Sequence, residues 1–88
     1  MILKVFSVAD SAAGAFMQPF FSISQGAAIR SFVDAVNDAN HEFHKHAADY
    51  TMFLLGEFDD SNGSFQTQEP VKILTAFEVL IKDVSPSR

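Results

Sequence analysis

Two segments of this sequence are apolar on both faces of the strand that each of them predicts. Residues 2–8 are rich in β-branched and aromatic residues. Alternation along residues 50–58 places Met52 and Phe58 on one face and Phe53 on the other. A small antiparallel sheet normally needs one apolar face, because water covers the other. The second face is therefore expected to be covered by residues 11–24, by another subunit or by a ligand.

The small size of the chain makes this surplus of apolar surface more significant. A chain of 88 residues forms one domain that buries only roughly 60% of its unfolded surface. Ten Phe residues and 48% apolar residues, against 19% charged residues, exclude a disordered chain. We therefore expect a dimer or larger homo-oligomer. The absence of Cys excludes disulfide scaffolds and thiolate metal sites, and no cofactor is expected.

The clearest helical pattern covers residues 25–38. Four apolar residues there are spaced at i, i+3, i+4 and i+7, which gives a stripe that faces a core. They are Ile29, Phe32, Val33 and Val36. Ser22 or Ser24 can cap the N-terminus of this helix, and Asn37 marks its end.

The segments around this helix are less uniform in pattern. Residues 59–63 contain the Asn-Gly pair of a tight hairpin turn, and residues 64–68 would return with Phe65 as a buried anchor. Residues 12–17 could form a helical turn, and residues 20–23 a short edge strand.

Residues 71–82 fit two periods. Apolar residues recur at helical spacing from Val71 to Ile81, and Pro70 suits the first turn of a helix. Alternate residues from Val71 to Val79 fit a strand equally. Of the two, we expect the helix.

Together these patterns predict an α+β domain over residues 1–84, followed by a flexible C-terminal tail at residues 85–88. Its small antiparallel sheet would have three or four strands and would pack on one central helix at residues 25–38, with a second helix at residues 71–82. No segment approaches the ~18 apolar residues of a membrane span, and no signal peptide is expected.

The densest group of chemically active side chains is the three His residues within residues 41–46. His41 and His44 would share a face only on a helix, whereas the neighbouring Asn and Asp residues predict a loop. We therefore expect a solvated surface here and no metal site. Neither a nucleophile elbow nor a phosphate-binding glycine pattern is present, so no catalytic residue and no enzyme activity are expected.

Nucleic-acid binding would require aromatic platforms and local positive charge, because the net charge of −5 opposes a basic clamp. The candidate phosphate contacts are Arg30 and Lys45, followed by Lys4 and Lys72. The aromatic candidates are Phe16, Phe20, Phe21 and Tyr50, of which Phe20 or Phe21 is preferred as the stacking surface. Ten Phe residues also suit an ordinary core, so this interpretation competes with a structural one.

Several runs of the sequence are collinear with one bacteriophage family. They are residues 1–11, residues 15–21 (Ala-Phe-Met-Gln-Pro-Phe-Phe), residues 26–38, residues 44–51 and residues 56–63. This pattern, over about residues 1–65, resembles the small nonstructural protein of the Microviridae, the tailless icosahedral single-stranded DNA bacteriophages, especially the gokushovirus branch. Family members often have Pro where this chain has Ala39 and Ala47, which concerns the stiffness of that loop.

The resemblance implies a DNA-binding protein of viral genome replication in the cytoplasm of the host cell. Such a protein would assist the switch from double-stranded replicative form to single-stranded genomes. Its expected partners are DNA, in particular single-stranded DNA, and phage or host replication proteins. The alternative is an acidic homo-oligomeric interaction module that binds a replication protein without contacting DNA.

Overall fold

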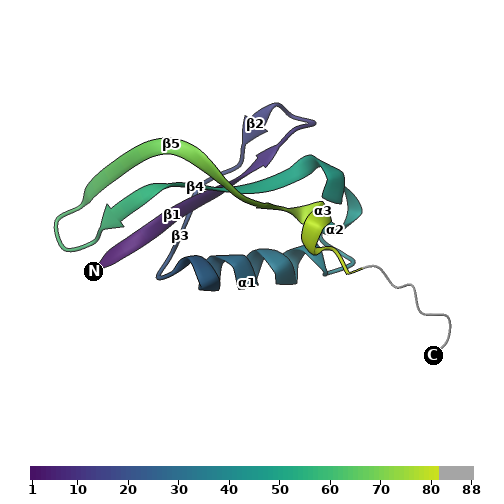
Figure 1. The fold of residues 1–88 in the computed structure, drawn as a ribbon, viewed down its shortest axis with the longest axis horizontal. Coiled ribbons are helices and arrows are strands. Elements are labelled where there is room, and N and C mark those ends of the chain that lie inside the picture. The colour runs from purple at the N-terminus through teal and green to yellow at the C-terminus, as the bar shows by residue number, and fades with distance from the viewer. Residues whose placement is uncertain (82–88) are drawn as a thin grey trace, which may run out of the picture.

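The computed structural model describes residues 1–81. The main feature of this part of the chain is one curled antiparallel sheet (Figure 1). The tail predicted at residues 85–88 lies outside the described residues. The elements in chain order are β1 (Ile2–Asp10), β2 (Ala15–Phe16), β3 (Phe20–Ser22), α1 (Gln25–Val36), α2 (Glu42–Lys45), the 3-10 helix η1 (Ala47–Asp49), β4 (Tyr50–Asp59), β5 (Ser64–Thr75) and α3 (Ala76–Val79). Within this described part, no helix is long and apolar enough to cross a membrane.

The sheet is built around β1, and every strand pairing in it is antiparallel. β4 pairs along one side of β1, and β5 pairs with the outer side of β4. β2 and β3 pair one after the other with the remaining side of β1. Strands therefore hydrogen-bond β1 on both sides, and β5 forms one edge of the sheet.

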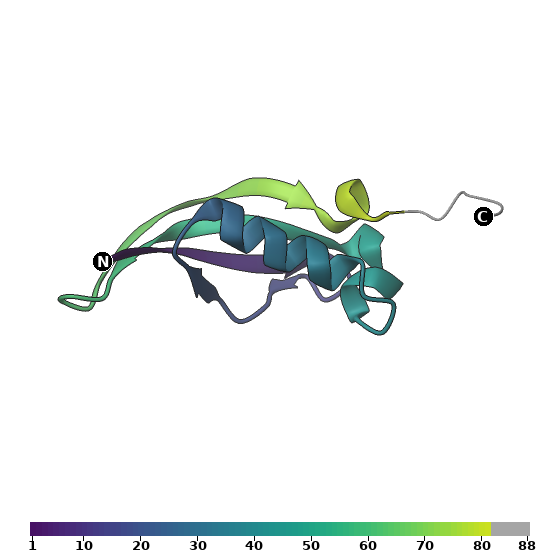
Figure 2. The same cartoon turned by 90° about the horizontal axis from the view of Figure 1, so that it is seen from below.

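The predicted fold class, a three- or four-stranded sheet packed on one central helix, is wrong. The chain is mostly β: five strands hold 44% of the described residues in a curled, half-barrel sheet, and short helices hold 28%. α1 occupies Gln25–Val36 and lies against β3, α2 and α3 (Figure 2). Phe32 and Val36 reach the core, but an apolar cavity separates part of α1 from β1.

The helix predicted over residues 71–82 is also wrong. β5 continues to Thr75, and only Ala76–Val79 are helical, with residue 82 outside the described part. These residues form a strand because Val71 pairs with Leu54 and Leu74 with Met52. The backbone of β4 thereby supplies hydrogen-bond partners that would be absent if the segment were helical. Two irregularities in this pairing accommodate the extra residues of β5. Pro70 is tolerated because β5 is an edge strand.

Residues 11–24 extend the sheet at its edge. Asp10 accepts hydrogen bonds from the backbone N–H groups of Ala12 and Ala13, at 3.0 and 3.3 Å, and so begins a turn that leads into β2. The helical turn considered for residues 12–17 therefore does not form. The edge strand considered for residues 20–23 is present as β3.

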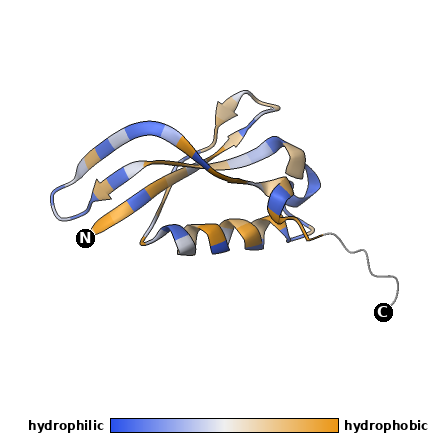
Figure 3. Ribbon diagram, viewed as in Figure 1, coloured by the Kyte–Doolittle hydropathy of each residue, from blue (hydrophilic) through white to orange (hydrophobic). Residues whose placement is uncertain are grey.

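The core lies between the sheet and the helices. Ser24 caps α1 by accepting a hydrogen bond from the backbone N–H of Ala27 at 3.1 Å, which sets the helix register. The buried core residues are Phe6, Val8, Ala28, Phe32, Val36, Phe43, Ala47, Tyr50, Met52 and Ala76. Figure 3 shows hydrophobic residues along β1 and at intervals along α1, whereas the first half of β5 is mainly hydrophilic.

Candidate nucleic-acid interface

The face of the sheet opposite α1 carries five Phe rings. Phe6 and Val8 of β1 belong to the core on the α1 side, so the β1 residues that alternate with them face the other way. Residues paired across antiparallel strands share a face, and each of the five Phe residues pairs with one of these alternating β1 residues or with another Phe of the set. We call this set the Phe face; it consists of Phe16, Phe21, Phe53, Phe58 and Phe65.

The rings of the Phe face form two separate groups. Phe58 contacts Phe21 and Phe65 with ring centroids 5.3 and 4.7 Å away, and the centroids of Phe21 and Phe65 are 6.2 Å apart. Phe16 and Phe53 form the second group, edge to face, with centroids 5.3 Å apart. Aromatic pairs at such distances stabilise each other beyond the area that they bury. Each group is therefore a preformed aromatic surface.

The Phe face is open to solvent even though smaller residues on it are buried. Phe16, Phe21 and Phe65 are 48%, 46% and 58% exposed, whereas Val5 and Ser7 on the same face are 6% and 0% exposed. The hydroxyl of Ser7 donates a 2.6 Å hydrogen bond to the carbonyl oxygen of Met17, so its polar atom is satisfied. A ligand on this face would therefore contact mainly the exposed Phe rings.

Charge on the Phe face comes from one lysine. Among the residues that strand pairing places on this face, Lys72 is the one with a charged side chain, and it lies opposite Phe53. Glu57 is paired with Lys4 and points to the other side of the sheet. Glu78 lies near Lys72: hydrogen bonds from the backbone and hydroxyl of Thr75 lower the pKa of Glu78, and the positive charge of Lys72 adds to this effect.

The two preferred stacking residues lie on opposite sides of the sheet. The ring of Phe20 stacks on Phe6, with centroids 5.8 Å apart and planes inclined by 24°, and so faces the core. Phe21 belongs to the Phe face. Tyr50, another aromatic candidate, is buried; burial raises the pKa of its hydroxyl above the usual 10.0, and nearby carboxylates, chiefly that of Asp10, raise it further.

The candidate phosphate contacts are dispersed in the same way. Arg30 is on α1 and Lys45 on α2, both on the side of the sheet opposite the Phe face. Lys4 donates a 3.3 Å hydrogen bond to a carboxylate oxygen of Glu57. Only Lys72 lies among the Phe rings, so the structure does not bring the four cations together.

Sequence reasoning missed three residues of the Phe face: Phe53, Phe58 and Phe65. Phe65 was expected to be a buried anchor, but it is 58% exposed, because in the described part of the chain no layer covers that side of β5. Alternation along residues 50–58 predicted a second apolar face that includes Phe53, but it wrongly placed Phe58 on the face of Met52. An extra residue in β4, at the register shift opposite Val5 and Phe6, brings Phe58 to the same face as Phe53. Assigning Phe65 to that face required the pairing of Phe58 with Phe65, which follows from the hairpin register.

The three His residues belong to a short helix, where a loop was expected: His44 lies within α2, and His41 and His46 are its N-cap and C-cap residues. Nδ1 of His41 accepts a 3.0 Å hydrogen bond from the backbone N–H of Phe43 and caps α2, and Nδ1 of His44 lies 3.0 Å from the carbonyl oxygen of Val36. Over residues 1–81, no group of three or more His, Asp or Glu side chains is arranged to hold a metal ion. These His contacts organise the chain between α1 and β4.

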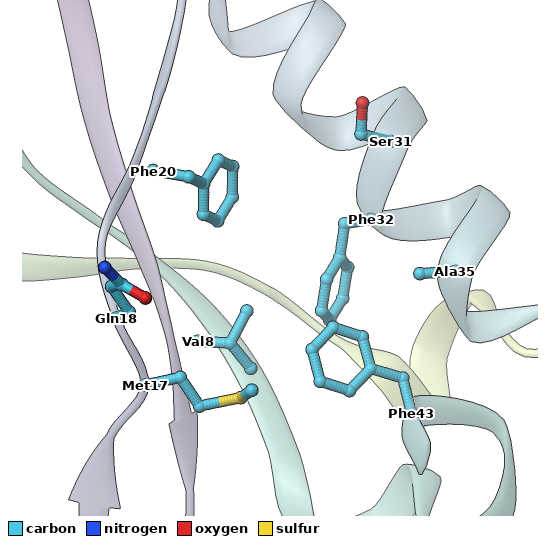
Figure 4. Close-up of a pocket in the computed structure, with 8 residues that line it drawn as sticks. All are labelled: Val8, Met17, Gln18, Phe20, Ser31, Phe32, Ala35 and Phe43. Carbon is cyan, nitrogen blue, oxygen red and sulfur yellow. The ribbon is translucent and has the colours of Figure 1, made fainter. Parts of the chain in front are cut away.

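An apolar cavity of about 250 Å³ lies between α1 and β1, on the side of the sheet away from the Phe face (Figure 4). Its lining residues are Val8, Met17, Gln18, Phe20, Ser31, Phe32, Ala35 and Phe43. In the close-up, the rings of Phe20, Phe32 and Phe43 converge on this space. None of the described residues that line the cavity has an ionisable side chain, so the described lining is suited to packing.

Comparison with known proteins places the chain among phage proteins. The model of the family described as Phage ORF5 protein matches residues 3–79, which is most of the chain. Neither the curated proteins nor the solved structures provide a match. The strands that carry the Phe face lie within the matched residues, apart from the first residue of β1. The chain therefore belongs to the Phage ORF5 protein family.

Proposed function

We propose that this phage protein binds single-stranded DNA on the Phe face and acts as a nonenzymatic accessory protein of genome replication. The observation that supports the proposal is the set of Phe rings on one sheet face, of which Phe16, Phe21 and Phe65 are about half exposed, next to Lys72. Among the described residues, strand pairing places no carboxylate on this face. Stacking a base on an aromatic side chain contributes roughly 1–3 kcal/mol. Two groups of rings that each stack one base would together contribute roughly 2–6 kcal/mol.

Stacking on aromatic rings explains how a protein with a net charge of −5 would bind DNA. Each phosphate contact with a single strand contributes about −0.7 to the slope of log K against log salt concentration. A site with Lys72 as its main phosphate contact should therefore show a slope of about −0.7, far shallower than that of a basic clamp. Because a duplex hides its base faces, the same site should prefer single strands.

A role in replication follows from the resemblance to the Microviridae nonstructural protein. A protein that covers bases on a newly displaced strand would hinder copying of that strand into duplex, and so would favour single-stranded genomes. The protein would act in the cytoplasm of the infected host cell, together with phage or host replication proteins.

Fluorescence anisotropy tests the proposal directly. Fluorescein-labelled oligothymidylate and a duplex of equal length would be titrated at low and moderate salt with the wild type, Lys72→Ala and Lys45→Ala. We expect preference for the single strand, a shallow salt slope and a several-fold loss of affinity in Lys72→Ala only. Absence of binding at low salt would overturn the proposal, as would an equal loss in Lys45→Ala, because Lys45 lies on the other side of the sheet.

An acidic homo-oligomeric interaction module is the second candidate, because exposed aromatic rings also suit a protein partner. We propose that the chain self-associates as a dimer or larger, which sedimentation at micromolar concentration would reveal. Self-association through the Phe face, together with no binding of oligonucleotide at low salt, would favour this module. A monomer at that concentration would remove the homo-oligomer.

A further inference from the structure

The Phe face is divided along its length, and this division has a consequence for any strand that it binds. We propose that the face holds single-stranded DNA at two separate stacking platforms, so that a strand must exceed a minimum length to occupy both. The inference rests on the proposed function and adds the geometry of the ligand to it.

The two platforms are distinct in structure. The hairpin platform consists of Phe21, Phe58 and Phe65, near the β4–β5 turn, and the central platform consists of Phe16 and Phe53. Both draw rings from more than one strand, so the sheet fixes their separation. Neither depends on the helices for its position.

On β1, β4 and β5, the row of paired residues between Phe53 and Phe58 on this face consists of small residues. Val5 pairs with Gly56, and Gly56 pairs with Thr67, so this row carries no ring on the Phe face apart from Phe21 at its end. A base therefore finds an aromatic surface at either platform and none between Phe53 and Phe58 on β4. The strand must cross this interval without stacking.

The interval determines the expected length of DNA. Phe53 and Phe58 are five residues apart on β4, and at ~3.3 Å per residue their separation is at most ~16 Å. The extra residue of β4 near Leu55 shortens it slightly. A strand that advances ~3.4 Å per nucleotide crosses ~16 Å in about five nucleotides. Oligomers of about six or more nucleotides should therefore reach both platforms.

Charge assigns different roles to the two platforms. Lys72 lies opposite Phe53, so the central platform combines stacking with a phosphate contact, whereas strand pairing places no cation beside Phe58. Salt should therefore weaken binding at the central platform more than at the hairpin platform.

Linking two weak sites through one strand produces avidity. Once both ends of the strand can bind together, the second contact becomes intramolecular and gains the effective concentration of a short linker. We expect the affinity of the wild type to rise at least ~10-fold between oligomers of about four and about eight nucleotides, and only gradually beyond that.

A length series of oligothymidylates tests the proposal, using the wild type, Phe53→Leu, Phe65→Leu and the control Phe77→Leu. Leu retains apolar bulk but removes the stacking ring, and Phe77 is an exposed Phe on α3, outside the Phe face. Thermal melting would verify that each variant folds. We expect the steep rise in affinity to persist in Phe77→Leu and to shrink to about threefold or less in the two platform variants.

The outcomes separate this inference from the proposed function. If long oligomers bind but affinity rises smoothly with length, and equally in all four proteins, the two-platform arrangement is overturned while DNA binding stands. If no oligomer binds at low salt, both are overturned. A steep rise that survives in Phe53→Leu or Phe65→Leu would also overturn the two-platform arrangement.

Discussion

Replacing Gly56 by Ala should destabilise the protein more than any other single addition of a methyl group to its glycines. Gly56 lies in β4 at φ +155°, where the backbone of β5 approaches closely. A Cβ there would collide with the carbonyl oxygen of Gln66 and would lie 3.1 Å from its carbonyl carbon and 3.2 Å from Cα of Thr67. All three contacts are with backbone, so no side chain can move aside.

The size of the effect can be worked from this geometry. Overpacking costs typically 1–3 kcal/mol, about the same as holding a non-glycine residue in a sparsely populated backbone region. The sum, about 2–6 kcal/mol, compares with a total stability of roughly 4–13 kcal/mol for 88 residues. Even the lower value should reduce Tm by about 8–16 °C.

Gly26→Ala is the matched control for this experiment. Gly26 lies in the first turn of α1, and a Cβ there would meet no atom within 4 Å. The same substitution should therefore stabilise the protein, by up to about 1 kcal/mol. Urea unfolding followed by circular dichroism measures both variants. A Gly56→Ala protein within about 0.5 kcal/mol of the wild type would refute the close approach of β4 and β5.

Four further predictions concern charge, titration and packing. Glu78→Gln keeps the capping box of α3 but removes a carboxylate near Lys72. Fluorescence anisotropy should therefore show a severalfold gain in oligonucleotide affinity. An unchanged or lower affinity would contradict the placement of Lys72 in the site. Hydrogen bonds lower the pKa of Glu78 below 4.5. The ionised Glu78 therefore stabilises the fold above pH 4.5, and this contribution is lost as the pH falls through the lowered pKa. Melting curves should show a smaller acid-induced decrease in Tm for Glu78→Gln than for the wild type. Burial raises the pKa of Tyr50, the one Tyr in the sequence, above 10.0. Ultraviolet titration should therefore show that Tyr50 ionises at higher pH in the folded than in the urea-unfolded protein. Coincident titration curves would disprove the burial of its hydroxyl. Ala35→Leu should fill part of the cavity beneath α1 and raise the free energy of unfolding by about 0.5–2 kcal/mol, and a loss of stability would show that the cavity cannot accept the side chain.

Local signals in the sequence predicted the elements whose formation depends on neighbouring residues. The apolar stripe of residues 25–38 and the cap at Ser24 give α1 at Gln25–Val36. The Asn62-Gly63 pair lies in the turn that joins β4 and β5, where Gly63 has φ +75°. In each case the energetics are decided within a few residues, so periodicity and turn chemistry suffice.

The prediction of the fold class was wrong for the segments whose structure depends on pairing with distant strands. Residues 71–75 carry both helical and strand periods, and the pairing of Val71 with Leu54 selects the strand. Residues 11–24 were expected as one cover for the second sheet face, but Phe20–Ser22 pair with the edge of β1 instead. A sequence pattern alone cannot show which edge a segment joins, because the partner lies far away in the chain.

The candidate site was only partly predictable for the same reason. Phe21 and Lys72 were named from the sequence, whereas Phe53 and Phe65 were assigned to apolar strands without a functional role. The expected second apolar face exists, but its residues come from β2, β3, β4 and β5 and meet only through the sheet register. Composition cannot distinguish a Phe on this face from a Phe in the core.

Nuclear magnetic resonance mapping of an oligothymidylate titration tests the central claim, that the Phe face binds single-stranded DNA, most directly. We predict that ring signals of Phe21, Phe53 and Phe65 and amide signals around Lys72 shift most, while those of Arg30 on α1 change little. The largest shifts at Arg30 and the rest of α1, with the Phe rings unaffected, would contradict the account.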